Sequence, residues 1–336
     1  MIRMHISLLL MALLGVTAAC TSDAPADQTT TRPVSDIDQL TEAISAHPDD
    51  PSVYVDRARF HYARKNYGDA IQDMASAMRL DSINEGYHHL LADIYLAALR
   101  SQLALNTLER AVALFPQSKS SRLKLAEMQI ILLQYPAASA NIRRVLETNP
   151  RDVDALYLLG VMYREQDDLD NAIQSFQTVV EIDADHHEAW VMLGNLLDMR
   201  DDPMALQCFE NAIAIDSTYP QGWHSKAFYL QNHGQVPEAL EIYERIHRLD
   251  STYLDAYLNA GILYLDQDNA AMAEEKFNRV IALNPDHPLG HYYLGITYES
   301  AGLDTQALTY LERAAALVPS SPRFASAVER VREKLQ

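Results

Sequence analysis

One short stretch, Asp183–Glu188, holds the densest group of possible metal ligands in the chain, with two histidines and three carboxylates in six residues. Imidazole nitrogens and carboxylate oxygens are common ligands of divalent ions. However, adjacent histidines at a helix start point in different directions, and acidic residues there are explained by the helix dipole. We therefore expect a helix start without a bound metal, and a divalent-ion site is the alternative.

The sequence carries none of the common catalytic or cofactor-binding motifs. It has no glycine-rich phosphate loop, no Gly-x-Ser-x-Gly elbow and no His-Glu-x-x-His zinc helix. Its acidic turns also lack the ligand spacing of a calcium-binding loop. We therefore expect neither enzymatic activity nor a bound cofactor.

Cys20 has the clearest expected chemistry, because residues 1–19 have the features of an export signal. Arg3 supplies the positive start, residues 6–16 the apolar stretch, and two alanines precede the cysteine. The segment resembles a bacterial lipobox, with Thr17 in place of the more usual leucine. The resemblance implies cleavage before Cys20 and lipid attachment to its sulfur, and several acyl chains would anchor the protein firmly. An ordinary secretory signal that ends near a cysteine is the alternative.

Residues 20–35 are rich in Thr, Asp, Ala and Pro and show no apolar periodicity. This composition predicts a flexible tether between the lipid and the folded part. Thr21 stands where an aspartate would resemble the inner-membrane retention signal of enteric bacteria. The sequence therefore favours the outer membrane of a bacterial cell envelope and leaves open which side of it the protein faces.

The second cysteine, Cys208, follows Leu206 by two residues and precedes Phe209 on a predicted helix. Since Cys20 is expected to be acylated, Cys208 has no partner for a disulfide within the chain. We expect a buried structural thiol, and a redox-active or intermolecular thiol is the alternative.

The chain is acidic, with a formal net charge of -19. Nucleic acids and anionic lipid surfaces attract patches of Lys and Arg, so this charge argues against both as direct partners. Much of the excess lies in stretches such as 167–170, 201–202 and 266–268, which we expect to be solvated turns.

A pattern of small and aromatic residues returns every 34 positions. Two clear copies are Leu156-x2-Leu159-Gly160-x2-Tyr163 with Ala172-x3-Phe176, and Tyr257-x2-Ala260-Gly261-x2-Tyr264 with Ala273-x3-Phe277. This pattern resembles the tetratricopeptide repeat. The resemblance implies an all-α fold, a right-handed α-solenoid superhelix of about eight helix-turn-helix repeats. The predicted repeats are 51–84, 85–118, 119–152, 153–186, 187–219, 220–253, 254–287 and 288–321.

Small residues recur where the two helices of each hairpin should approach most closely. The eighth position of the repeats holds Ala58, Ala92, Ala126, Gly160, Gly194, Ala227, Gly261 and Gly295. The twentieth holds Ala70, Ala104, Ala138, Ala172, Ala205, Ala239, Ala273 and Ala307. The fifth repeat is one residue shorter, because Ala205 comes a step early. Arg57, His61 and Gln129 stand where apolar or aromatic side chains are usual.

Both ends of the repeat array need a cover for their apolar faces. Residues 36–50 have the pattern of a partial repeat helix, and residues 322–336 that of a C-terminal capping helix. In the capping helix, an apolar stripe at helical spacing is expected from Phe324, Val328, Val331 and Leu335.

In this family, positions 2, 5, 9, 12 and 13 of each first helix line the concave surface. By position, the resemblance therefore assigns to a partner groove Tyr157, Val161, Arg164, Val191, Asn195, His224, Phe228, Leu258, Ile262, Leu265, Tyr292 and Ile296. Such a surface suits an extended peptide or a partner helix. Since first helices also pack against one another, structural burial of these residues is the alternative.

Together these patterns imply a non-catalytic adaptor of the bacterial cell envelope, held by its lipid and binding other proteins in the groove. Restriction to a membrane would raise its effective concentration toward partners on that membrane. The rival is a lipoprotein that captures glycan or a small molecule, suggested by Tyr62, Tyr157, Phe228 and Tyr292. An enzyme subunit is a third possibility. The sequence does not identify the partner.

Overall fold

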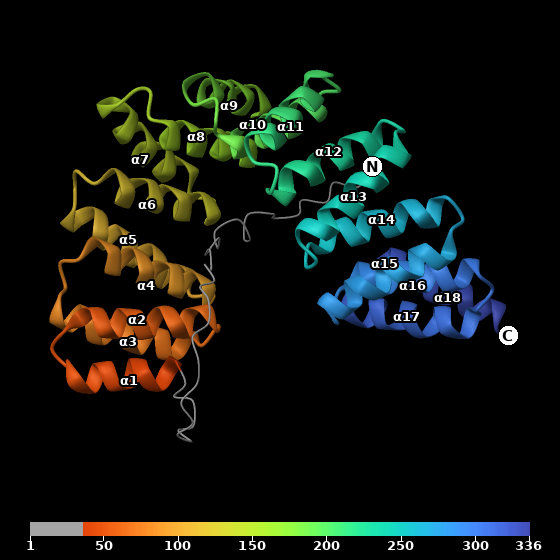
Figure 1. Ribbon diagram of the computed structural model, residues 1–336, viewed down its shortest axis with the longest axis horizontal. Helices are drawn as coiled ribbons and strands as arrows, with labels where there is room; N and C mark the ends of the chain where they lie inside the picture. The colour runs from red at the N-terminus through yellow and green to blue at the C-terminus, as the bar shows by residue number, and fades with distance from the viewer. Residues whose placement is uncertain (1–35) are drawn as a thin grey trace, which may run out of the picture. The chain divides into compact units, whose positions relative to one another are not determined.

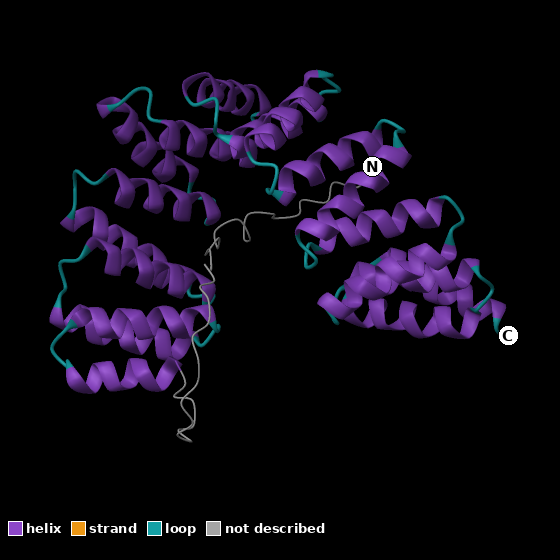
Figure 2. Cartoon of the chain, in the orientation of Figure 1, coloured by secondary structure: helices purple, strands orange, loops and turns teal. Residues whose placement is uncertain are grey.

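The computed structural model describes residues 36–336, which contain 18 α-helices and no strand (Figure 1, Figure 2). These residues divide into two compact units, 36–81 and 82–336. The expected export signal, the lipidated Cys20 and the tether lie outside the described residues. Within the described part of the chain, no helix has both the length and the apolar character needed to cross a membrane.

The first unit contains α1 (Asp36–Ala46) and a helical hairpin made of α2 (Pro51–Ala63) and α3 (Tyr67–Leu80). Arg57 on α2 donates hydrogen bonds of 2.9 and 2.7 Å to the two carboxylate oxygens of Asp73 on α3. Asp73 is only 4% exposed. An ion pair thus stabilises this hairpin at Arg57, where an apolar contact is usual in the repeat pattern.

The second unit contains seven hairpins and a final helix, each hairpin packed on the next (Figure 1). In chain order the hairpins pair α4 (Glu85–Ala97) with α5 (Ser101–Leu114), α6 (Lys119–Ile131) with α7 (Tyr135–Thr148), α8 (Val153–Glu165) with α9 (Leu169–Ile182), α10 (His187–Asp198) with α11 (Met204–Ile215), α12 (Pro220–Asn232) with α13 (Val236–Leu249), α14 (Leu254–Asp266) with α15 (Ala270–Leu283), and α16 (Pro288–Ser300) with α17 (Asp304–Leu317). The final helix is α18 (Pro322–Lys334). The even-numbered member of each hairpin is its first helix.

Capping side chains and prolines determine where several of these helices begin. Asp152 accepts a 3.1 Å hydrogen bond from the backbone N–H of Ala155, and Ser321 accepts one of 3.4 Å from Phe324. Each bond satisfies a donor that the first turn of a helix leaves unpaired. In addition, α12, α16 and α18 begin with proline, which needs no backbone partner at that position.

A small residue on each first helix faces a large one on the second helix, and this contact recurs throughout the second unit. The residues at these two repeat positions are Ala92 and Leu108, Ala126 and Ile142, Gly160 and Phe176, Gly194 and Phe209, Ala227 and Tyr243, Gly261 and Phe277, and Gly295 and Leu311. The large member is never more than 1% exposed. A Cβ atom at Gly194 would lie 2.5 Å from Cε1 of Phe209. The glycines therefore make room for the rings, as the sequence pattern predicts.

The fifth repeat is shorter in its helices as well as in its sequence. α10 and α11 each have 12 residues, whereas α8 has 13 and α9 has 14. Pro203 immediately precedes α11, with φ -63° and ψ -16°.

α18 buries Phe324, Val328 and Val331 in the apolar cluster that it shares with α16 and α17. Leu335, which the sequence pattern placed on the same stripe, is 47% exposed. That assignment was wrong, because the helix ends at Lys334 and Leu335 follows as its C-cap.

The turn inside every hairpin of the second unit passes through one residue of positive φ. These residues are Leu99, Leu133, Asp167, Asp201, Gly234, Asp268 and Gly302. The N–H of the next residue bonds back across the helix end, as from Arg100 to the carbonyl of Tyr95 at 2.8 Å. Glycine and aspartate tolerate this conformation better than leucine. Leu99 and Leu133 are nevertheless 88% and 68% exposed, so little packing compensates their strain.

We predict that Leu99→Asn and Leu133→Asn each raise the free energy of unfolding by about 0.5 to 1 kcal/mol, because asparagine adopts this backbone conformation with less strain. Urea denaturation followed by circular dichroism measures the change. Asp167→Asn, at the equivalent turn position, is the matched control and should leave the stability unchanged. Lower stability in both leucine variants would contradict the strain argument.

Candidate partner-binding face

The first helices of the second unit share one side of that unit. α4 contacts α6, α6 contacts α8, α10 contacts α12, and α14 contacts α16. In residues 82–336, no two successive second helices contact each other to the same extent. Positions 2, 5, 9, 12 and 13 recur at helical spacing and so fall on one side of each first helix. We call the side chains at these positions the first-helix face.

Much of the predicted groove is packed rather than exposed. Four of its twelve residues are buried, namely Val161, Val191, Leu258 and Tyr292, with exposed fractions of 6%, 1%, 8% and 7%. Seven are partly buried: Tyr157, Arg164, Asn195, His224, Ile262, Leu265 and Ile296. Phe228 alone among the twelve is exposed, at 43%. The first-helix face thus serves packing to a large extent, and its use as a groove stays a prediction.

Two large apolar side chains remain accessible on this face. They are Phe228 on α12 and Met199, which follows α10 and is 65% exposed. Sequence reasoning did not select Met199, although it occupies position 13 of its repeat. The Phe228 ring stacks on His224, with ring centroids 6.4 Å apart. Burial lowers the pKa of His224, and Asn259 lies 3.1 Å from its Nε2, so this histidine is a neutral supporting residue.

Some charged side chains of the face are paired. Asp93 on α4 forms a 2.7 Å ion pair with Lys124 on α6, which joins two successive first helices. Arg164 on α8 pairs with Glu165 at 2.7 Å and also lies 3.0 Å from the sulfur of Met192 on α10. These basic groups are therefore already engaged within the protein.

Four other carboxylates of the face have no such partner. Glu127, Asp198, Asp255 and Asp266 make no hydrogen bond or ion pair through their side chains within residues 36–336. Burial raises the pKa of Glu127, and it also raises the pKa of Asp198. Asp255 and Asp266 are exposed. Lys124 partly offsets the raised pKa of Glu127, and His233 that of Asp198, without forming an ion pair. A bound cation in direct contact would stabilise both charged forms further.

Glu299, at position 12 of the last repeat, is paired with basic residues of the capping helix α18. Its carboxylate accepts hydrogen bonds of 2.8 and 2.6 Å from Arg330 and one of 2.7 Å from Lys334. These bonds lower the pKa of Glu299 from 4.5 to about 2. Tyr292 on the same helix stacks on Phe324 of α18, with ring centroids 5.0 Å apart. α18 therefore covers the end of the first-helix face.

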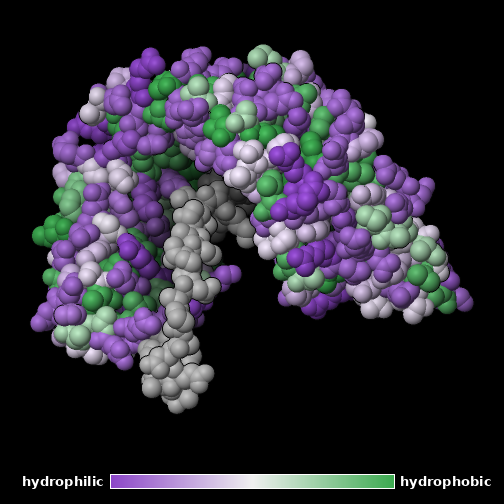
Figure 3. Space-filling model, in the orientation of Figure 1, coloured by the Kyte–Doolittle hydropathy of each residue, from purple (hydrophilic) through white to green (hydrophobic). Residues whose placement is uncertain are grey.

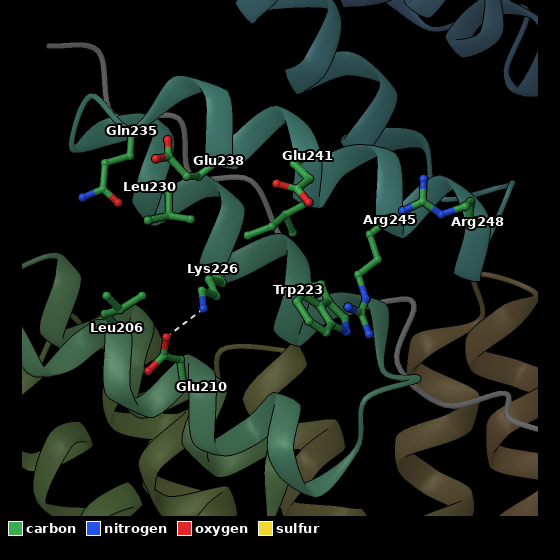
Figure 4. A pocket seen from close by; sticks show the side chains of 11 residues that line it. Leu206, Glu210, Trp223, Lys226, Leu230, Gln235, Glu238, Glu241, Arg245 and Arg248 are labelled. Atoms are coloured by element: carbon green, nitrogen blue, oxygen red, sulfur yellow. Dashed lines mark hydrogen bonds and ion pairs between the residues drawn. The ribbon is translucent and has the colours of Figure 1, made fainter.

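A cavity of about 440 Å³ lies between α11, α12 and α13, lined by residues at other repeat positions than those of the face (Figure 4). The Arg245 guanidinium stacks over the Trp223 ring, 3.8 Å from its centroid, and Lys226 pairs with Glu210 at 2.7 Å. The remaining lining residues are Leu206, Leu230, Gln235, Glu238, Glu241, Ile242 and Arg248. No motif in the sequence indicated this cavity. Both acidic and basic side chains line it.

The stretch Asp183–Glu188 forms a helix start in the structure. His186 is the N-cap of α10 and accepts a 3.3 Å hydrogen bond from the N–H of Ala189 through Nδ1. In residues 36–336, no three His, Cys, Asp or Glu side chains are grouped so that they could hold a metal ion.

Cys208 is a buried free thiol, and burial raises its pKa to about 11, which keeps it protonated and unreactive near neutral pH.

The visible surface is mostly hydrophilic, with apolar residues in small separate patches (Figure 3). Isolated apolar residues are normal on a folded protein, so exposure alone does not identify a binding site. On the first-helix face, accessible Met199 and Phe228 occur together with unpaired carboxylates, and exposed large apolar residues also occur on second helices, at Leu103, Leu114, Met204 and Leu249.

Comparisons with known proteins agree with the helical-repeat architecture. The sequence matches the family described as "Tetratricopeptide repeat" over residues 37–82, 132–187, 226–288 and 258–322. No curated protein matches the sequence.

Several solved structures share the fold at low sequence identity. The crystal structure of the APC/C hetero-tetramer Cut9-Hcn1 matches with a TM-score of 0.60 and 14% identity, over 88% of this chain and 58% of that chain. A tetratricopeptide repeat protein from Parabacteroides merdae matches with a TM-score of 0.55 and 14% identity, over 74% and 98%. PilW, described as a type IV pilus biogenesis factor, matches with a TM-score of 0.56 and 19% identity, over 64% and 98%. At these identities the likeness is one of fold.

We predict that Glu299→Gln lowers the free energy of unfolding at pH 6 by about 1 to 2 kcal/mol, after allowance for the half-exposed partners of Glu299. The folded-state pKa is depressed from 4.5 to about 2. The stabilisation by Glu299 is therefore present above pH 4.5 and disappears as the pH falls toward 2.

Urea denaturation of both proteins between pH 6 and about pH 2.5 measures this effect, because the difference between them should shrink across that window. Glu312→Gln is the control, since its ion pair with Arg332 joins two side chains that are 45% and 47% exposed. A difference that stays constant with pH would contradict the assigned role of Glu299.

Proposed function

Because the chain belongs to the tetratricopeptide repeat family, we propose that it is a non-catalytic adaptor that binds other proteins along the first-helix face. The observation that carries this proposal is the accessibility of two apolar side chains: Met199, just after α10, is 65% exposed, and Phe228, on the next first helix, is 43% exposed. Partly buried Ile262 and Leu265 continue the apolar surface on α14. A bound peptide or helix could cover these side chains with its own apolar residues.

The Phe228 side chain has an aromatic neighbour within the protein. Phe228 stacks on His224, whose ring also lies 5.4 Å from that of Tyr253, the N-cap of α14. The exposed ring therefore has one aromatic neighbour on its own helix before a partner arrives. A preorganised side chain loses less conformational entropy on binding, so more of its contact energy appears as affinity.

We further propose that the adaptor is attached to a bacterial envelope membrane, with the outer membrane favoured, through lipid on Cys20. Support comes from the export-signal pattern of residues 1–19 and from the lipobox-like segment that ends at Cys20. A tether of residues 20–35 would let the folded part reach partners on the same membrane.

Capture of a glycan or a small molecule is the second candidate. Glycan binding through stacked aromatics needs accessible rings, but Tyr292 is only 7% exposed and Tyr157 is partly buried under the ring of His186, 4.9 Å away. Among the aromatic residues of 82–336 that suggested glycan binding, Phe228 alone is exposed. The cavity beside Trp223 is the place where a small ligand would fit. Protein binding has the broader support.

We predict that the double variant Met199→Ser with Phe228→Ser reduces partner recovery about tenfold or more, because two exposed contact residues are removed. The measurement is quantitative mass spectrometry after affinity capture from solubilised membranes of the source organism. The control, Leu114→Ser with Leu249→Ser, changes two second-helix residues that are 39% and 40% exposed. Both variants should retain the circular dichroism spectrum of the wild type. If the two double variants recover equal amounts of partner, the first-helix face is not the binding site.

We predict that Cys20→Ser moves the protein from the membrane fraction to the soluble fraction, because acylation of its sulfur is the proposed anchor. Membrane fractionation followed by immunoblotting measures the distribution. Cys208→Ser is the matched control and should remain with membranes, since that thiol is buried in α11. A Cys20→Ser protein that still sediments with membranes would disprove the lipid anchor.

A further inference from the structure

The unpaired carboxylates of the first-helix face lie in the same repeats as its accessible apolar side chains. Asp198 immediately precedes Met199 at the end of α10, and Asp266 ends α14. Phe228 lies on α12, the first helix between them. Asp198 and Asp266 make no hydrogen bond or ion pair through their side chains in the described part of the chain.

The same face shows how its carboxylates are satisfied when a neighbouring helix supplies a cation. Asp93 on α4 receives Lys124 from the next first helix at 2.7 Å. Glu299 on α16 receives Arg330 and Lys334 from α18 at 2.6 and 2.7 Å. In both cases a basic residue of an adjacent helix approaches an acidic residue at position 9 or 12.

In the middle of the first-helix face, no basic residue at a face position is available to pair with Asp198 or Asp266. Across the first helices of repeats four to eight, the face positions contain one cation, Arg164. Its guanidinium is held by Glu165 at 2.7 Å and lies 3.0 Å from the Met192 sulfur. No basic side chain of residues 36–336 forms an ion pair with Asp198 or Asp266, although His233 acts on Asp198 from a greater distance and Asp266 is exposed. A cationic side chain of a bound segment can therefore pair with each of them.

We infer that the segment bound by the first-helix face is basic, with Lys or Arg side chains that pair with Asp198 and Asp266 on either side of an apolar residue that contacts Phe228. This inference rests on the proposed adaptor function and specifies its partner. α10 and α14 are two first helices apart, on the order of 20 Å. An extended segment spans that distance with about six residues.

The direct test is fluorescence anisotropy with defined peptides. The probe is a labelled peptide of about twelve residues, with lysine pairs about six residues apart and leucines between them. In one comparison peptide glutamate replaces lysine, and in another serine replaces leucine. The basic apolar peptide should bind at least about tenfold more tightly than either, and its affinity should fall as salt rises.

Matched variants distinguish a specific site from the general acidity of the chain. Asp198→Asn with Asp266→Asn should weaken binding about fivefold or more. Glu109→Gln with Glu181→Gln removes the same charge from exposed residues of α5 and α9 and should have less than about a twofold effect. Equal weakening by both pairs, or equal binding of the glutamate peptide, would overturn the inference.

The same variants separate this inference from the proposed function. If partner capture from membranes depends on Phe228 but not on Asp198 and Asp266, the adaptor stands and the basic partner is rejected. If capture is lost in both variants and weakens with salt, the basic partner is supported. If neither variant affects capture, both proposals for this face fail.

Discussion

The rest of the structure depends on one close contact, a residue without a large side chain opposite a fully buried large one. At Gly261, an added Cβ would lie 2.6 Å from Cε1 of Phe277. In other repeats alanine stands at the glycine position, with Ile142 opposite Ala126 and Tyr243 opposite Ala227. Interiors packed to this density tolerate little change in volume, so the contact fixes the separation of the two helices in each hairpin. Each hairpin then presents its first helix to the next.

The first-helix face contains both buried and accessible side chains. Val191 is 1% exposed and serves packing, whereas Phe228 is 43% exposed one repeat later. Charged residues divide in the same way, because Asp93 is paired with Lys124 and Asp198 is not paired in the described structure. Side chains that join repeats and side chains that stay accessible therefore occur on the same helices. This division explains why the repeat pattern alone does not define a binding site.

The sequence predicted those features that depend on local spacing, such as the helical hairpins and the glycine opposite Phe176. Features that depend on distant residues could not be predicted in the same way. Tyr292 is covered by Phe324, and Glu299 is paired with Arg330, both of which belong to α18. Leu335 was assigned to the buried stripe because a helical pattern does not specify the last residue of a helix. The cavity beside Trp223 requires three helices to be placed together, which no local motif describes.

The central claim is that a partner binds the first helices in the middle of the second unit and not their second helices. Hydrogen–deuterium exchange, measured with and without the captured partner, tests it most directly because amide protection can be assigned to single helices. The account predicts added protection in α10, α12 and α14, with little change in α11, α13 and α15. Protection confined to the second helices, or centred on the cavity beside Trp223, would contradict it.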